Sequence, residues 1–191
     1  MTVQPLDVLV ICGSLRKGSY NRALARLLPS LAPPGLELRE APSFERFPIY
    51  NGDVEASSGF SAEVTAWADA IRGADALIIV SPEYNWSIPG GLKNAIDWVS
   101  RMKEQPFKDK PVVLQSCAPG LLGGSRMQYH LRQSLTTLEV ALFAKPEVIV
   151  AMAAQKFNAQ TLALEDQVAI DLIKQQLAAF EKFARRWLRK E

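Results

Sequence analysis

The sequence predicts an α/β protein with a five-stranded parallel sheet covered by helices on both faces. Apolar, strand-like segments alternate along the chain with amphipathic, helix-like segments, and this alternation is typical of a parallel sheet with crossover helices. Residues 76–80 are continuously apolar, as expected of a central strand that is buried on both sides. Right-handed crossovers leave few topologies, and five strands suit the spatial order 2-1-3-4-5.

Length and composition point to one globular domain over residues 1–191. Apolar residues make up 48% and charged residues 22%, and the net charge is +2 with well-mixed signs. The basic cluster at residues 185–190 fits the end of a helix better than a nucleic-acid site. No apolar run reaches membrane-spanning length, and Met1 leads into the first strand without a signal peptide. We therefore expect a cytoplasmic protein that binds neither membrane nor nucleic acid.

Hydrophobic periodicity and turn residues place the individual elements. Strands are predicted over residues 6–12, 36–41, 76–80 and 111–116, and in a last segment at 140–143 and 147–151 that is bent or broken at Pro146. Helices are predicted over residues 23–31, 61–73, 92–101 and 125–138, and from about residue 165 to the end. The segment 36–41 alternates apolar and charged residues and is interpreted as an edge strand. The aromatic residues of the turn-rich stretch 42–60 are expected to pack over the core; the alternative is that they line a ligand or subunit surface.

The loop at residues 13–21 lies between the first strand and the first helix. Such a loop directs free backbone N–H groups and the positive end of the helix toward one point, which favours an anion. Ser14, Ser19 and Asn21 add neutral donors, and Arg16 adds a guanidinium suited to a phosphate. The loop is interpreted as a phosphate site; the alternative is a turn in which Ser19 or Asn21 only caps the helix. It contains neither a dinucleotide-binding fingerprint nor a P-loop motif.

Two further loops, at residues 81–91 and 117–124, are rich in glycine, proline and small polar residues. In the predicted strand order they meet the first loop at the carboxyl edge of the sheet, where such folds bind ligands. Tyr84 and Trp86 either flank a flat ring or pack against the neighbouring prolines, and Glu83 and Asn85 either organise the loop or contact a ligand.

The two cysteines and the single histidine indicate neither a disulfide nor a metal site. Cys12 and Cys117 end strands that another strand separates by roughly 10 Å, too far for a disulfide. They are interpreted as small residues near the ligand. One histidine, His130, cannot assemble a metal site alone, so no metal is expected. The pair Lys93 and Asp97 has the spacing of a surface ion pair on a helix.

Several segments together resemble a known family. Residues 13–21 (GSLRKGSYN), 82–85 (PEYN) and 89–98 (PGGLKNAIDW) are similar to those of the NAD(P)H-dependent FMN reductases, a flavodoxin-like family. The nearest branch is that of the soluble bacterial quinone and chromate reductases. The resemblance extends through residues 123–133 to residues 145–147.

The resemblance implies FMN as cofactor and NADPH or NADH as electron donor. The cofactor-binding residues that we predict from it are Ser14, Arg16, Lys17, Gly18, Ser19, Tyr20, Asn21, Pro82, Glu83, Tyr84, Asn85, Trp86, Ser116 and Cys117. It also implies that the flavin carries the chemistry, without a catalytic side chain. Hydride would pass from NAD(P)H to FMN, and electrons would then pass, by a ping-pong mechanism, to quinones, chromate, azo compounds, ferric complexes or free flavin.

The resemblance further implies a homodimer, often paired into a tetramer. Arg126, Tyr129 and Glu147 belong to a polar set that is either a solvated helix face or a subunit interface. The alternative function is a flavodoxin-like electron carrier without enzymatic activity. Carriers are often strongly acidic, however, whereas this chain is nearly neutral. A phosphate-responsive signalling domain would require acidic residues at the end of the first strand, where Ile11, Cys12 and Gly13 lie.

Overall fold

A computed structural model describes residues 4–188 of the chain. The strands are β1 (Leu6–Cys12), β2 (Leu36–Glu40), β3 (Ala76–Val80), β4 (Pro111–Cys117), β5 (Ala141–Leu142) and β6 (Val148–Val150). The helices are α1 (Tyr20–Leu31), α2 (Gly52–Ser58), α3 (Ala62–Gly73), α4 (Gly90–Val99), α5 (Ser125–Thr136), α6 (Ala153–Lys156) and α7 (Gln167–Leu188). Arg189 and Lys190 of the predicted basic cluster lie outside the described residues.

The strands form one parallel sheet in the order β2-β1-β3-β4-β5, which confirms the predicted topology. The pairing of β1 with β3 runs from Val8 opposite Ala76 to Cys12 opposite Val80. All five residues of β3 are buried, as the apolar run predicted. In β2, which pairs only with β1 within this order, one residue of five is buried, which confirms an edge strand.

The last predicted strand is interrupted. Its two parts, β5 and β6, both pair with β4, one at each end of that strand. The break contains Pro146, as the sequence predicted, since proline has no N–H to donate to a sheet. Gln176 of α7 donates from Nε2 to the Pro146 carbonyl oxygen at 2.7 Å, so this carbonyl group has a hydrogen-bond partner within the break.

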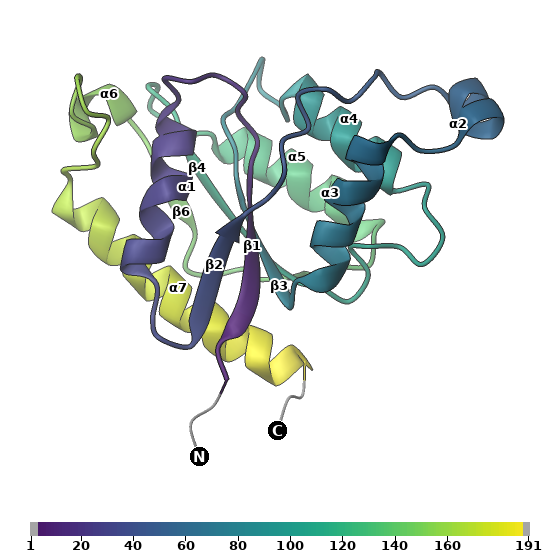
Figure 1. The fold of residues 1–191 in the computed structure, drawn as a ribbon. Helices are drawn as coiled ribbons and strands as arrows, with labels where there is room; N and C mark the ends of the chain where they lie inside the picture. Colours follow the sequence, from purple (N-terminus) through teal and green to yellow (C-terminus); the bar gives the residue numbers. More distant parts are fainter. Residues whose placement is uncertain (1–3, 189–191) are drawn as a thin grey trace.

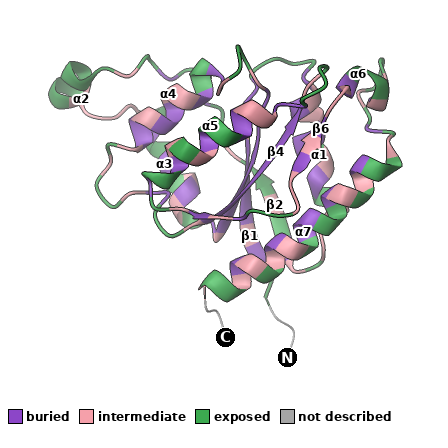
Figure 2. Cartoon of the chain, turned by 180° about the vertical axis from the view of Figure 1, so that it is seen from behind, coloured by how far each residue is buried: buried purple, intermediate pink, exposed green. Residues whose placement is uncertain are grey.

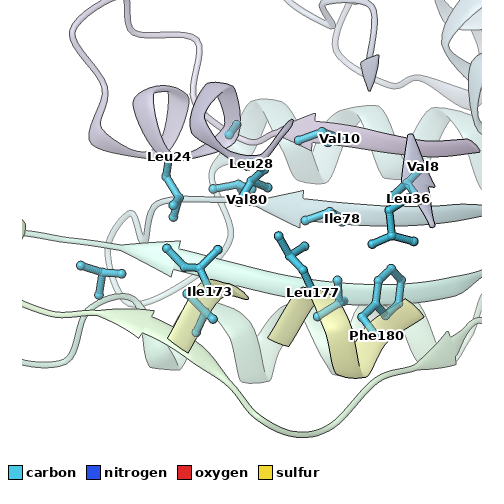
Figure 3. Packing of buried hydrophobic residues seen from close by; sticks show 14 of the residues in the cluster. Val8, Val10, Leu24, Leu28, Leu36, Ile78, Val80, Ile173, Leu177 and Phe180 are labelled. Atoms are coloured by element: carbon cyan, nitrogen blue, oxygen red, sulfur yellow. The ribbon is translucent and has the colours of Figure 1, made fainter. Parts of the chain in front are cut away.

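Helices cover both faces of the sheet (Figures 1 and 2). Helices α1 and α7 lie on one face, and α3, α4 and α5 lie on the other. Figure 3 shows the first of these layers, in which apolar side chains of α1 and α7 meet those of the sheet. The labelled residues are Leu24, Leu28, Ile173, Leu177 and Phe180 from the helices and Val8, Val10, Leu36, Ile78 and Val80 from the strands. No helix within residues 4–188 is long and apolar enough to cross a membrane.

The segment between β2 and α3 differs from the prediction, because it contains a short helix, α2, that projects from the body of the molecule (Figure 1). Its seven residues include none that is buried, so it has no apolar stripe for periodicity to detect. Phe44 and Phe47 pack into the core as predicted, whereas Ile49 is 82% exposed. Helix α6 was also not predicted, and with four residues it is too short for a periodic signal.

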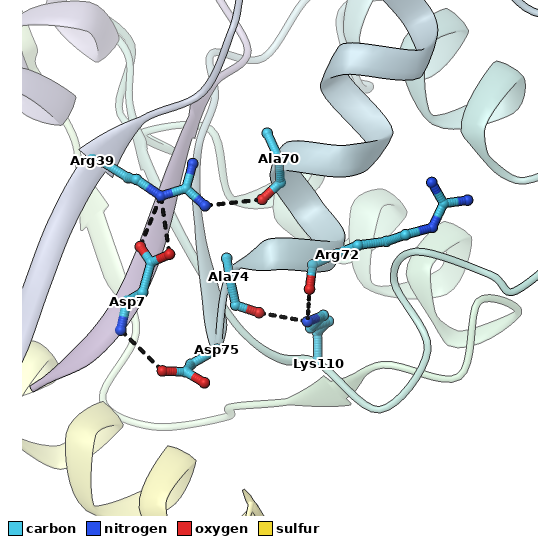
Figure 4. A network of polar contacts seen from close by, with 7 residues as sticks. All are labelled: Asp7, Arg39, Ala70, Arg72, Ala74, Asp75 and Lys110. Atoms are coloured by element: carbon cyan, nitrogen blue, oxygen red, sulfur yellow. Dashed lines mark hydrogen bonds and ion pairs between the residues drawn. The ribbon is translucent and has the colours of Figure 1, made fainter. Parts of the chain in front are cut away.

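A polar network links β1, β2 and the residue before β4 to one another and to α3 (Figure 4). Arg39 of β2 donates from Nε to the carboxylate of Asp7 at 2.8 Å and from Nη2 to the carbonyl oxygen of Ala70 in α3. Lys110 donates to the carbonyl oxygens of Arg72 and Ala74 at the end of α3. These charged groups lie at the edge of the sheet opposite to the three predicted ligand loops, so their role is structural.

Candidate functional site

A cavity of about 470 Å³ lies where β1, β3 and β4 end. This volume is within the usual range for small-molecule sites. The three loops that the sequence predicted to converge each form part of its wall. The lining residues are Ser14, Arg16, Ser19, Tyr20, Asn21, Pro82, Glu83, Tyr84, Cys117, Ala118 and Pro119.

The first wall is the turn from β1 into α1. Gly13 donates its N–H to the Val80 carbonyl oxygen at 2.8 Å, and a Cβ at Gly13 would lie 2.3 Å from Oγ of Ser81. Only glycine therefore allows the chain to turn this close to β3. Ser19 caps α1, since its Oγ accepts from the N–H of Arg22 at 3.4 Å. The hydroxyl hydrogen remains free to donate to a ligand, so Ser19 can both cap the helix and bind an anion.

Two arginines support this loop from different sides. Arg16 lines the cavity and donates from Nη2 to the Gly18 carbonyl oxygen at 2.6 Å, which folds its side chain over the turn. Arg22 donates from Nη2 to the Ser14 carbonyl oxygen at 3.0 Å and pairs with Glu40 at 3.5 Å. Arg22 was not predicted as a site residue. Arg22 lies on the first turn of α1, close in sequence to the loop that it contacts, and this proximity is the one signal in the sequence.

The second wall belongs to a tight turn between β3 and α4. Tyr84 and Ser87 exchange two backbone hydrogen bonds, of 3.0 and 2.9 Å. Asn85 and Trp86 between them have φ values of 47° and 68°, and this left-handed conformation is unfavourable for a bulky residue. The Trp86 ring lies against the guanidinium of Arg126, with 3.7 Å from Cζ to the ring centroid. The ring therefore packs on α5.

Glu83 joins the second loop to the first turn of α5. Its Oε2 accepts from the N–H of Met127 at 3.2 Å, and its Oε1 pairs with Arg126 at 3.4 Å. The N-cap residue of α5 is Gly124, which makes no side-chain capping bond. The Glu83 carboxylate therefore satisfies an N–H of the first turn from outside the helix. Of the two roles considered for Glu83, the structure shows the organising one.

The third wall follows β4. Gly123 and Gly124 have φ values of 56° and 93°, a region that favours glycine. Asn21 of α1 makes two hydrogen bonds to the backbone of Cys117, of 2.8 and 3.0 Å. Burial raises the pKa of the Cys117 thiol far above its usual range and also raises that of Cys12. Both cysteines are free, as expected from their separation.

The structure brings nine of the fourteen predicted cofactor residues to the cavity: Ser14, Arg16, Ser19, Tyr20, Asn21, Pro82, Glu83, Tyr84 and Cys117. The other five do not line it. Lys17 and Gly18 lie on the exposed turn, Asn85 and Trp86 form the tip of the second loop, and the Ser116 hydroxyl is buried against Nε2 of Gln128 at 2.9 Å. Ala118 and Pro119 line the cavity but were not predicted, although they directly follow Cys117.

The polar set around Arg126, Tyr129 and Glu147, to which His130 and Arg132 of α5 also belong, makes several contacts within the chain. Arg132 pairs with Glu147 at 3.4 Å, and His130 Nδ1 lies 2.9 Å from Oγ of Ser87. Tyr129 is exposed. The predicted ion pair of Lys93 with Asp97 is present at 2.6 Å. Within residues 4–188, no three His, Cys, Asp or Glu residues lie close enough together to hold a metal ion.

Comparison with known proteins identifies the family. The family model described as NADPH-dependent FMN reductase matches residues 6–155. The chain belongs to this family. This FMN reductase family member is 46% identical over 183 residues to a quinone reductase of Escherichia coli K12, covering 96% of this chain and 97% of the relative. It is also 46% identical to an NAD(P)H-dependent FMN reductase of Pseudomonas aeruginosa, covering 95% and 96%.

A solved structure shares the fold of this FMN reductase family member closely. The flavoenzyme NAD(P)H:(acceptor) oxidoreductase FerB from Paracoccus denitrificans superposes with a TM-score of 0.83. The two are 31% identical, and the match covers 95% of this chain and 98% of that chain.

The residues of this FMN reductase family member fit an FMN molecule. The first intrahelical bond of α1 at its cap runs from Ala23 to Ser19, so the amides of Tyr20 and Asn21 have no acceptor inside the helix. Together with Arg16, which lines the cavity, these amides are donors of the kind that suit a phosphate group. Pro82, Tyr84 and Pro119 provide apolar surface for a flat ring.

Proposed function

We propose that this chain is an FMN-dependent NAD(P)H oxidoreductase that reduces quinones. The observation that carries the proposal is a cavity in which the N-terminus of α1, with its free amides and Arg16, adjoins apolar walls from the second and third loops. A flavin monophosphate has this combination of a charged tail and a flat ring. The names of the relatives, quinone reductase and NAD(P)H-dependent FMN reductase, support the same activity.

Each wall of the cavity has a separate task in this proposal. The amides at the start of α1, the hydroxyls of Ser14 and Ser19, and the guanidinium of Arg16 hold the phosphate. Pro82, Tyr84 and the residues after Cys117 hold the ring. The bound flavin supplies the hydride and electron chemistry. We assign no catalytic acid or base, because the carboxylate of Glu83 is already bonded to Met127 and Arg126.

We propose further that NAD(P)H and the acceptor use the cavity in turn, which would give ping-pong kinetics. Beyond quinones, an accessible reduced flavin would also pass electrons to chromate, azo compounds, ferric complexes and free flavin.

We propose that the protein is cytoplasmic and that the chain forms one FMN-binding domain. We expect a homodimer or tetramer in which the surface around Arg126, Tyr129 and Glu147 lies near a subunit contact, and light scattering would measure its mass. A monomer at micromolar concentration would contradict the assembly.

The activity is tested with the purified protein and added FMN. We expect a yellow protein that retains FMN through gel filtration and oxidises NADPH when a quinone is present. Rapid reduction of the flavin by NADPH alone would distinguish the enzyme from an electron carrier, which needs a partner reductase. Protein that binds no FMN would refute the proposal.

Arg16→Ala tests the phosphate site. The fold should remain intact, because Arg16 is exposed and its bond to Gly18 is local. Loss of a charge-assisted contact should cost about 1.5–3 kcal/mol, which is tenfold or more in FMN affinity. Lys103→Ala, on an exposed turn that does not line the cavity, is the control. If both variants bind FMN equally well, Arg16 does not hold the phosphate.

A further inference from the structure

A buried side-chain amide joins the first and third loops of the cavity. Asn21 donates from Nδ2 to the Cys117 carbonyl oxygen at 2.8 Å and accepts at Oδ1 from the Cys117 N–H at 3.0 Å. Asn21 is 3% exposed and Cys117 is 1% exposed, so water does not compete for these bonds. The two residues are 96 positions apart in the chain.

The end of β4 explains why Cys117 needs this partner. Backbone groups of successive residues in a strand point to alternate sides. Ala118 donates toward β6, to Val150 at 3.1 Å, whereas the Gln115 carbonyl oxygen accepts from Ser81 at 3.0 Å, on the β3 side. Cys117 therefore also faces the β3 side.

At this level β3 has ended, and the chain leaves the sheet at Pro82. The N–H and C=O groups of Cys117 would then be buried without partners, which is costly. The planar amide of Asn21 carries one donor and one acceptor, as a peptide group does, and it satisfies both. It takes the place of the missing strand.

We infer that Asn21 is a positioning residue that holds the third loop, and with it the wall at Cys117–Pro119, in register with the phosphate loop. This inference rests on the proposed function, since it assumes that the cavity binds FMN. It gives Asn21 a different role from the one predicted from the sequence, which was to contact the phosphate. Asn21 lies on α1, whose N-terminus would bind the phosphate. Through its bonds to Cys117, however, Asn21 acts on the wall that would hold the ring.

The two roles are separated by comparing FMN with riboflavin, which has the same ring system but no phosphate. If Asn21 positions the third loop, Asn21→Ala weakens binding of both flavins by the same factor, about tenfold or more. If Asn21 binds the phosphate, only FMN affinity falls. Arg16→Ala is the matched control, because its loss should reduce FMN affinity and leave riboflavin affinity unchanged. Titration of flavin fluorescence measures the affinity of the wild type and of both variants for each flavin.

A second readout follows the ring environment directly. At saturating FMN, the visible circular dichroism of the bound flavin should change in Asn21→Ala and remain that of the wild type in Arg16→Ala. A wild-type spectrum in Asn21→Ala, or an unchanged riboflavin affinity, would overturn the inference.

If Asn21→Ala does not fold, Asn21→Asp keeps the acceptor for the Cys117 N–H while removing the donor. It is then tested with riboflavin, where charge repulsion with a phosphate plays no part, and an unchanged affinity would again overturn the inference. A wild-type protein that binds neither flavin would instead refute the proposed function, so the two failures are distinguishable.

Discussion

Replacing Glu83 with glutamine removes a negative charge from the junction between the second loop and α5. The Glu83 side chain is 12% exposed and bonds to two donors, the Met127 N–H at 3.2 Å and the Arg126 guanidinium at 3.4 Å. Glutamine has nearly the same size but only one acceptor oxygen. Its NH₂ group must face one of these donors, which leaves that donor without an acceptor.

The expected loss follows from these contacts. Hydrogen bonds to a charged group contribute about 1.5–3 kcal/mol, and a carboxylate at a helix N-terminus adds about 0.3–1 kcal/mol. Because the carboxylate is largely buried, screening by solvent is weak. We expect Glu83→Gln to lower the free energy of unfolding by about 2–3 kcal/mol. Glu181→Gln is the control: Glu181 accepts from one donor among the described residues, Nε of Arg185 at 2.9 Å. Glutamine keeps an acceptor oxygen for this donor, so the change should cost about 1 kcal/mol or less.

Urea unfolding followed by circular dichroism, without added flavin, measures both changes. The slope of free energy against urea should be the same in the variants, so that a shifted midpoint reports stability. Adding Arg126→Ala to Glu83→Gln should cost less than the sum of the single changes, because the two residues share one interaction. If Glu83→Gln lowers the free energy of unfolding no more than Glu181→Gln does, the contact of Glu83 with the N-terminus of α5 does not stabilise the protein.

Three further predictions concern other parts of the molecule. Burial raises the pKa of the Cys117 thiol, so the thiol stays protonated at neutral pH. Iodoacetamide should therefore modify Cys117 slowly in the native protein and rapidly in urea, and mass spectrometry measures the modified fraction. The backbone N–H of Ala169 and the charge of Lys156 lower the pKa of Asp166. The ionised Asp166 therefore stabilises the native protein fully above the pKa that this group has in the unfolded chain. This stabilisation is lost as the pH falls through the pKa of Asp166 in the folded protein. Asp166→Ala should then cost about 0.5–1 kcal/mol at neutral pH and nothing in acid, by urea midpoints. Leu177→Ala, at a position that is 0% exposed, should cost about 2–5 kcal/mol in the same assay; a loss below 1 kcal/mol would contradict the packing in Figure 3.

The strands and the long helices could be predicted because their signals are local. The apolar run of β3 and the alternation of β2 are readable in a few residues, and both strands are present in the structure. The convergence of the three loops followed from strand order alone. Helices α2 and α6 could not be predicted, because segments of seven and four residues carry too little periodicity.

The site was predicted less completely, since its details depend on contacts between distant residues. Ser116 and Cys117 are neighbours in β4, but side chains alternate across a sheet. Only Cys117 reaches the cavity, while Ser116 is bonded to Gln128. The stacking of Trp86 on Arg126 joins residues on two separate elements, and no pattern in either segment indicates the other. The partnership of Asn21 with Cys117 is likewise visible only when the strand ends are placed in space.

The walls of the cavity come from three stretches of chain near residues 14–21, 82–84 and 117–119. These stretches lie far apart in the sequence and come together only in the folded sheet, so an unfolded chain has no assembled site for a flavin. Occupancy and folding are consequently linked: a ligand at one hundred times its dissociation constant would stabilise the native form by about 2.7 kcal/mol. In a cell short of flavin, the same chain would be opened and degraded more often.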